Sequence, residues 1–269
     1  MKQFIGIVCV LSLSFLALAA LPHRNPEAKE SSLAGMRAPV IVELFTSEGC
    51  SSCPPADTLL SKLEDLQPVK GAEVIALEEH VDYWNSLGWT DPFSSGEFTS
   101  RQRDYAEVFK QGSVYTPQMV VDGSKELVGS RSRDVGVTIA EAARQPKTVM
   151  KLEQNSPAKE NTLQFSITTG KFNSEPQDSK VDIWIAVTER RLHSDVKRGE
   201  NAGEDLHHAA VVRFLRKIGT ADTSKETSFS GTATIPLERS WQRENLLIVT
   251  FSQGRKSKRI VGAASSKIL

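Results

Sequence analysis

Hydrophobic residues follow two different patterns along the chain, and the change falls near residue 147. In the first part, apolar strand-like runs alternate with segments in which leucines and other apolar residues recur at helical spacing. We expect strands over 40–45, 73–77, 118–121 and 126–128, and helices over 56–66, 98–110 and 134–144. An aromatic-rich stretch, 79–111, forms a helical insert that packs on the core. This order predicts an α/β domain over residues 38–147, with a central mixed sheet flanked by helices.

After Pro146 the helical signals fade, and short alternating runs separated by turn-forming stretches replace them. The expected strands lie at 163–168, 181–187, 211–213, 232–234, 246–251 and 259–263. This pattern predicts a second, mostly antiparallel and sandwich-like β domain over residues 148–269.

The N-terminus has the layout of a secretory signal peptide. Met-Lys-Gln precedes an uncharged run of 18 residues, 4–21, which contains the small-residue site Ala17-Leu18-Ala19. We expect a signal peptide over 1–20 and a flexible lead-in over 21–37. The alternative is an uncleaved membrane anchor, since eighteen residues are just long enough to span a bilayer. Both interpretations place the body outside the cytosol, periplasmic or secreted, where disulfides persist.

Charge excludes one class of partner. The chain has 33 basic and 33 acidic residues, and Lys2 is the only charged residue in the first 20, so removing them leaves 32 against 33, a net charge of −1. Hydrophobic residues at 39% and charged residues at 25% describe a soluble globular protein. Without a strong electrostatic field, nucleic acid is not expected as the main partner. Membrane contact is expected only if the N-terminal segment is retained.

The cysteines carry the clearest chemical signal. Cys9 lies in the N-terminal apolar segment, whereas Cys50-Ser51-Ser52-Cys53 follows a predicted strand and opens a predicted helix. Two thiols at this spacing close a small ring disulfide and reopen it. The positive end of the helix dipole stabilises a thiolate there, so we expect a solvent-reachable pair in which Cys50 is the reactive residue.

The order of elements, with its CxxC motif and a Thr-Pro dipeptide before the third strand, resembles the thioredoxin fold. The residues that carry the resemblance are Cys50, Cys53 and Thr116-Pro117. It implies that Pro117 is cis and packs beside the disulfide, and that the backbone of Thr116 binds an extended substrate. Glu43 matches the buried acid of thioredoxins, which implies either a proton shuttle for the resolving thiol or only a local hydrogen bond.

The sequence departs from thioredoxins around the motif, because Glu48-Gly49 replaces a tryptophan before Cys50 and two serines separate the cysteines. The reduction potential therefore stays open. The whole chain resembles an uncharacterised secreted thioredoxin-like family, a domain of unknown function, in which CxxCPPAD, Thr-Pro-Gln and a Gly-Glu-Asn-x-Gly segment at 199–203 occur together. That segment is either a hairpin loop capped by Asn201, or it brings Glu200 or His207 to the cysteines.

Three functions are compatible with these features. The first is an extracytoplasmic thiol–disulfide oxidoreductase that needs no organic cofactor and acts with thiol or disulfide substrate proteins and a redox partner. The second is a copper-binding or metallochaperone module that uses Cys50, Cys53 and His80, with His207 or His208 from the second domain. The third is a non-enzymatic envelope binding protein with a structural disulfide. A disulfide that closes so small a loop adds little stability, which disfavours the third function.

Overall fold

The computed structural model describes Met1 and residues 37–155, 161–172, 178–225 and 227–268. The chain from Arg37 onward forms one compact unit. The predicted signal peptide and nearly all of the lead-in lie outside the described residues. No helix in the described part of the chain is long and apolar enough to cross a membrane.

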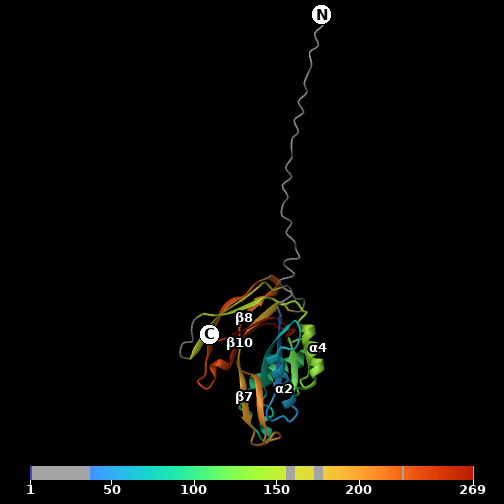
Figure 1. The fold of residues 1–269 in the computed structure, drawn as a ribbon, viewed down its shortest axis with the longest axis vertical. Coiled ribbons are helices and arrows are strands. Elements are labelled where there is room, and N and C mark those ends of the chain that lie inside the picture. The colour runs from blue at the N-terminus through green and yellow to red at the C-terminus, as the bar shows by residue number, and fades with distance from the viewer. Residues whose placement is uncertain (2–36, 156–160, 173–177, 226, 269) are drawn as a thin grey trace. The chain divides into compact units, whose positions relative to one another are not determined.

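Most of the strands form one large mixed sheet (Figure 1). Its order is β11-β10-β7-β8-β2-β1-β3-β4, and β1 pairs with β2 in parallel, as β2 does with β8, while the other neighbours are antiparallel. The strands of this sheet are β1 (Ala38–Thr46), β2 (Ala72–His80), β3 (Gln118–Val121), β4 (Lys125–Val128), β7 (Lys180–Asp195), β8 (Asp205–Asp222), β10 (Leu246–Gly254) and β11 (Ile260–Lys267).

A second sheet is antiparallel and has the order β5-β6-β9. Its strands are β5 (Met150–Gln154), β6 (Thr162–Thr169) and β9 (Ser230–Pro236). Apolar side chains such as Phe165 and Ile235 from this sheet and Ile183 and Ile185 from β7 share one core. The predicted boundary at residue 147 falls between α4 (Ser132–Ala142) and β5, and both sides of it supply strands to the larger sheet. The fold is therefore a mixed α/β arrangement with a large mixed sheet and a smaller antiparallel one.

In the part of the chain that the structure describes, the α-helices are α2 (Pro54–Leu66), α3 (Gly96–Val108) and α4 (Ser132–Ala142), and the 3₁₀ turns are η1 (Asn85–Leu87), η2 (Thr223–Lys225) and η3 (Arg243–Asn245). The predicted helices are confirmed to within two residues at each end. Two prolines open α2, where no intrahelical donor is needed, and Gln67 ends it in the left-handed conformation with φ 48°. The hydroxyl of Ser95 caps α3 by accepting a hydrogen bond from the amide of Glu97.

Alternation along β1 decides which helix each side chain meets. Val40, Val42 and Leu44 share a core with residues of α2 and α4, so these helices cover one face of the sheet. Ile41 packs instead with Phe98 of α3, on the other face. The first part of the chain is thus a sheet with helices on both sides.

Strands β7 and β8 are much longer than the sequence predicts. Their pairing continues from the core out to Asp195 and Asp205 and forms a long hairpin (Figure 1). The outer part was not predicted because its residues, among them Arg190, Arg191 and His193, do not alternate between apolar and polar. This extension brings the end of the hairpin to the CxxC loop.

Candidate functional site

Cys50 and Cys53 form a disulfide, with their Cα atoms 5.5 Å apart. Cys53 is the N-cap residue of α2, and its amide donates to the carbonyl of Cys50 over 3.1 Å. The hydroxyl of Ser52 lies 3.4 Å from the sulfur of Cys50. The pair therefore stands at the positive end of a helix, as predicted.

The Thr116–Pro117 peptide bond is cis, as the resemblance implies. Pro117 lies near the first turn of α2, because a Cβ atom built on Gly129 would be 3.1 Å from the Cβ of Ala56 and 3.5 Å from that of Pro117. The indole nitrogen of Trp84 donates to the hydroxyl of Thr116 over 2.9 Å.

Trp84 also contacts the other loop of the site, because its Cβ would lie 3.1 Å from a Cβ atom on Gly49. This one side chain, from the segment after β2, therefore touches both the residue before Cys50 and the residue before Pro117. The fold brings together the CxxC motif and the Thr-Pro dipeptide, although they are more than 60 positions apart in the sequence.

The expectation that the sulfurs are solvent-reachable is wrong for this conformation. Cys50 and Cys53 are both 0% exposed, and Pro117 is also buried, whereas Ser51 and Ser52 are exposed. A protein thiol can reach the disulfide only after something that covers it moves.

The tip of the β7–β8 hairpin, residues 197–204, is hydrogen-bonded to the CxxC loop. The carboxylate of Glu200 accepts hydrogen bonds from the amide and the hydroxyl of Ser51, at 3.2 and 2.7 Å. The side-chain amide of Asn201 donates to the carbonyls of Glu48 and Cys50, at 2.8 and 3.1 Å. The segment at 199–203 is thus a hairpin loop, and it also brings Glu200 to the motif.

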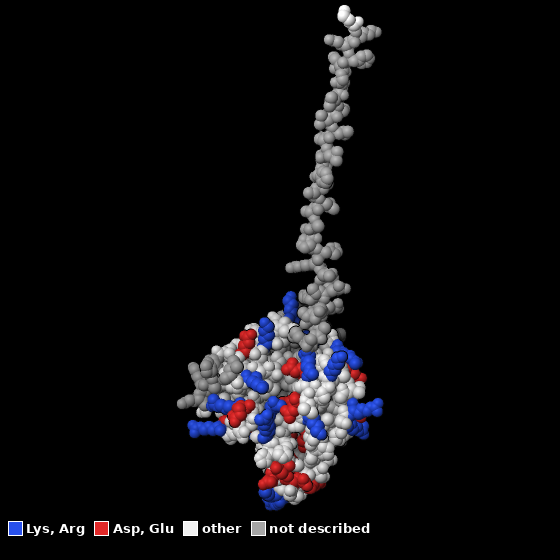
Figure 2. All heavy atoms as spheres, viewed as in Figure 1, with Lys and Arg blue, Asp and Glu red and all other residues white. Residues whose placement is uncertain are grey.

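Residues 197–204 include no large apolar side chain, and the charged residues among them are exposed, whereas Val196 just before them is 1% exposed. Figure 2 shows acidic side chains gathered with basic ones at the lower end of the molecule, where the hairpin ends in Figure 1. Hydrogen bonds therefore hold the tip on the motif, with little burial of large apolar side chains to add to them. Such a contact opens at a lower free-energy cost than a packed core does.

A cluster of buried charged side chains lies behind the CxxC loop. We call Glu48, Glu78, His80, Asp91 and His208 the buried charge cluster; each is at most 3% exposed. His208 bonds Glu78 through Nδ1 and Glu48 through Nε2, both at 3.0 Å. His80 bonds Asp91 through Nδ1 at 2.7 Å. Burial lowers the pKa of His208, but its bonds to the two glutamates outweigh burial and raise that pKa to about 9.

Asp57 is a further buried acid, on the first turns of α2. Its carboxylate accepts a hydrogen bond from the hydroxyl of Thr46 over 2.7 Å. Burial, and next the negative charge of Glu78, raise the pKa of Asp57 to about 7. Asp57 follows Cys53 by four residues, so the two side chains share one face of the helix start.

Glu43, the acid that the resemblance implied, has different neighbours. It alternates with Val42 and Leu44 and so lies on the face of β1 opposite α2. There one carboxylate oxygen accepts from Arg101 over 2.6 Å and the other accepts from the hydroxyl of Tyr105. The buried acid on the α2 face is Asp57, which sequence reasoning missed; the acid at position i+4 from Cys53 in CxxCPPAD was the available signal.

The histidines of the predicted copper site separate into two groups. His80 and His208 are buried together, whereas His207 has a side chain that is 75% exposed and pairs with Asp205 at 3.5 Å. Within the described residues, the one group of His, Cys, Asp and Glu side chains with ligand atoms close enough to share a metal ion is Glu78, His80 and His208. Neither cysteine belongs to it.

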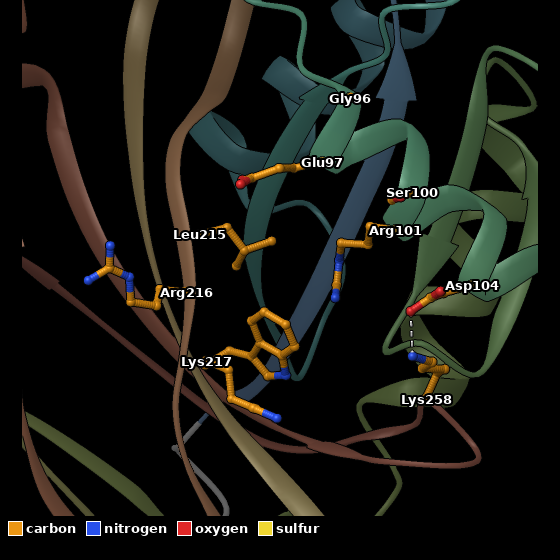
Figure 3. Close-up of a pocket in the computed structure, with 10 residues that line it drawn as sticks. Gly96, Glu97, Ser100, Arg101, Asp104, Leu215, Arg216, Lys217 and Lys258 are labelled. Carbon is orange, nitrogen blue, oxygen red and sulfur yellow. Dashed lines mark hydrogen bonds and ion pairs between the residues drawn. The ribbon is translucent and has the colours of Figure 1, made fainter.

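A cavity of about 690 Å³ lies elsewhere, between α3 and strands β7 and β8. Figure 3 shows Arg101 reaching into it from α3, opposite Leu215 and Lys217, while Asp104 pairs with Lys258 at 2.7 Å. Neither cysteine lines this cavity, and neither does Pro117. It is therefore not an entrance to the disulfide.

Comparison with known proteins identifies a family, and the description of that family states no function. No curated protein matches the chain. The fold is similar to that of a protein from Agrobacterium tumefaciens solved by structural genomics, with 29% identity, a TM-score of 0.63, and coverage of 86% of this chain and 95% of that one. It is also similar to HBP35 of Porphyromonas gingivalis, with 14% identity, a TM-score of 0.63, and coverage of 87% and 76%, a likeness of fold alone. The family DUF1223, described as a protein of unknown function, matches residues 41–253, and the chain therefore belongs to the DUF1223 family.

Proposed function

We propose that this protein is an extracytoplasmic thiol–disulfide oxidoreductase with a thioredoxin-like site. The observation that carries the proposal is the Cys50–Cys53 disulfide at the start of α2, whose first turn lies near a cis Thr116–Pro117 bond. A disulfide between residues i and i+3 restricts the unfolded chain little, so stabilisation alone explains it poorly. The signal-peptide pattern at the N-terminus supports an oxidising compartment.

The reaction is a pair of thiol–disulfide exchanges. A substrate thiolate attacks the sulfur of Cys50, the S–S bond breaks, and Cys53 leaves as a thiolate that takes up a proton. A second substrate thiolate then attacks the mixed disulfide and releases the oxidised substrate and the Cys50 thiolate, which is protonated in turn. Two electrons pass from the substrate dithiol to the protein, and the reverse steps reduce a substrate disulfide. A redox partner of dithiol or disulfide type resets the pair.

Asp57, rather than Glu43, is the residue that we assign to proton transfer at Cys53. Both oxygens of Glu43 already accept hydrogen bonds, from Arg101 and Tyr105. Asp57 shares a helix face with Cys53, and its pKa of about 7 lets it give and take a proton near neutral pH.

The hairpin tip acts as a gate in this proposal. The bonds from Glu200 and Asn201 hold it over the motif, so opening it precedes every exchange. An extended substrate then takes the place of the tip, with its backbone against Thr116.

The test is mixed-disulfide formation under native conditions. With glutathione disulfide as the probe, the Cys53→Ser variant should gain one glutathione on Cys50, observed by mass spectrometry. The matched variant Cys50→Ser should react at least about 10-fold more slowly, because the helix start favours the Cys50 thiolate. Equal rates for the two variants, or reaction only in denaturant, would contradict the proposal.

A further inference from the structure

Three side chains of the buried charge cluster present ligand atoms to one point. Nε2 of His80, Nδ1 of His208 and a carboxylate oxygen of Glu78 all lie within 4.8 Å of one another. The Glu78 oxygen is 3.3 Å from the His80 nitrogen and 3.0 Å from the His208 nitrogen. Glu78 and His80 are two residues apart on β2 and so share a face of the strand, and His208 comes from the neighbouring β8.

The outer contacts of these ligands are those of a metal site. His80 bonds the carboxylate of Asp91 through its other ring nitrogen, and His208 bonds the carboxylate of Glu48 in the same way. In metal sites a ligating histidine usually donates its second nitrogen to a carboxylate or carbonyl, which fixes the orientation of the ring. The second oxygen of Glu78 is held by the amide of Ala209 at 2.6 Å.

One atom in the cluster lacks a hydrogen-bond partner. Nε2 of His80 is fully buried and makes no hydrogen bond, although the Glu78 oxygen is near. A buried polar atom without a hydrogen bond is costly, and an ion held with the Glu78 oxygen 3.3 Å away would accept the lone pair of this nitrogen.

The charges also favour a cation. The carboxylates of Glu48, Glu78 and Asp91 surround the two imidazoles in a buried volume. A divalent ion that displaces the imidazole protons would compensate these carboxylates as the protons do.

We propose that His80, His208 and Glu78 bind a divalent first-row transition-metal ion, for which zinc is the best-fitting probe. Two nitrogens and one oxygen suit zinc, whose tetrahedral ligands lie about 3.3 Å apart. The distances from the Glu78 oxygen to the two histidine nitrogens already match this spacing. The distance between the two nitrogens would reach it if the side chains moved by about 1 Å. The site is separate from the copper site expected at the cysteines.

Phe93 separates the three ligands from the nearest cavity, so an ion would enter by displacement of this ring. The ring of Phe93 packs on His80 and His208, with centroids 5.5 and 5.2 Å apart. Its other side faces a cavity of about 220 Å³ lined also by Arg213 and Trp241. Because Glu48 precedes Gly49-Cys50, an ion here would also hold the base of the CxxC loop.

The test uses the oxidised full chain, whose cysteines cannot bind metal. Equilibrium dialysis against zinc should give one tightly bound equivalent and raise the melting temperature by several degrees. His208→Gln should lose the bound zinc, whereas His207→Gln, which changes the exposed neighbouring residue on the same strand, should keep it. Cobalt in place of zinc should give intense visible bands typical of four-coordinate ions in the wild-type protein.

Two further variants separate folding and redox effects from binding. Asp91→Asn keeps the shape of the side chain and should weaken zinc binding by roughly 10- to 100-fold with unchanged circular dichroism. The double variant Cys50→Ser/Cys53→Ser, which has no exchange activity, should bind zinc normally. Absence of tight zinc binding by the oxidised wild-type protein, or equal loss in His207→Gln and His208→Gln, would overturn the proposal.

Discussion

Replacing Asn201 by Ala should accelerate reduction of the Cys50–Cys53 disulfide by about 5- to 100-fold. The side chain of Asn201 is buried and donates to two carbonyls of the CxxC loop. Removing it leaves both carbonyls without that donor and destabilises the closed hairpin tip by about 1–3 kcal/mol. The open state, in which a thiol reaches the sulfurs, is then more populated by the corresponding factor.

The measurement is the rate of reduction by dithiothreitol at neutral pH without denaturant. Glu204→Gln is the matched control, because Glu204 is an exposed residue of the same hairpin tip and should leave the rate unchanged. Unfolding free energies of both variants show whether the effect is local. If Asn201→Ala is reduced no faster than Glu204→Gln, the hairpin tip is not the barrier to the disulfide.

Replacing Asp57 by Asn should stabilise the protein at pH 8 by up to about 4 kcal/mol, with little change at pH 4. The carboxyl pKa is raised in the folded state to about 7, so the folded protein binds the proton more tightly than the unfolded chain does. The contribution of Asp57 to the free energy of unfolding is therefore fully present below the pKa of the unfolded chain, near 4. It is lost as the pH rises towards the folded-state pKa of about 7. Asn cannot ionise, so it does not lose this stability, and it can still accept from Thr46.

The same substitution should slow disulfide exchange by roughly 100-fold near neutral pH, since Cys53 loses its proton donor. Unfolding free energies of variant and wild type between pH 4 and 8 give the first effect, and glutathione exchange rates give the second. Glu73→Gln, an exposed acid on β2, is the control for both. If Asp57→Asn is more stable but exchanges at the wild-type rate, Asp57 does not transfer a proton to Cys53.

Local signals in the sequence predicted the helices and the two halves of the redox motif. Two prolines after Cys53 and the leucine spacing that follows define α2 to within two residues. Alternation predicted the inner part of β7, but it stops near Val187, and the apolar run at 211–213 predicted only a short part of β8. Beyond that point each strand is stabilised by pairing with its neighbour, which the hydrophobic pattern of one strand does not predict.

The buried charge cluster was beyond sequence reasoning because its contacts are set by sheet register. Glu48 and His208 are 160 positions apart and meet only because β8 lies beside β2. Glu43 shows the opposite case. Since Val42 and Leu44 face α2, strand alternation alone directs Glu43 to the other face, where it makes the local hydrogen bonds that were the alternative to a proton shuttle.

The reduction potential of Cys50–Cys53, measured by equilibrium with a glutathione buffer, tests the exchange function most directly. We expect a value between about −270 and −120 mV, the range of CxxC oxidoreductases. A value below about −300 mV, typical of structural disulfides, would contradict the proposed function.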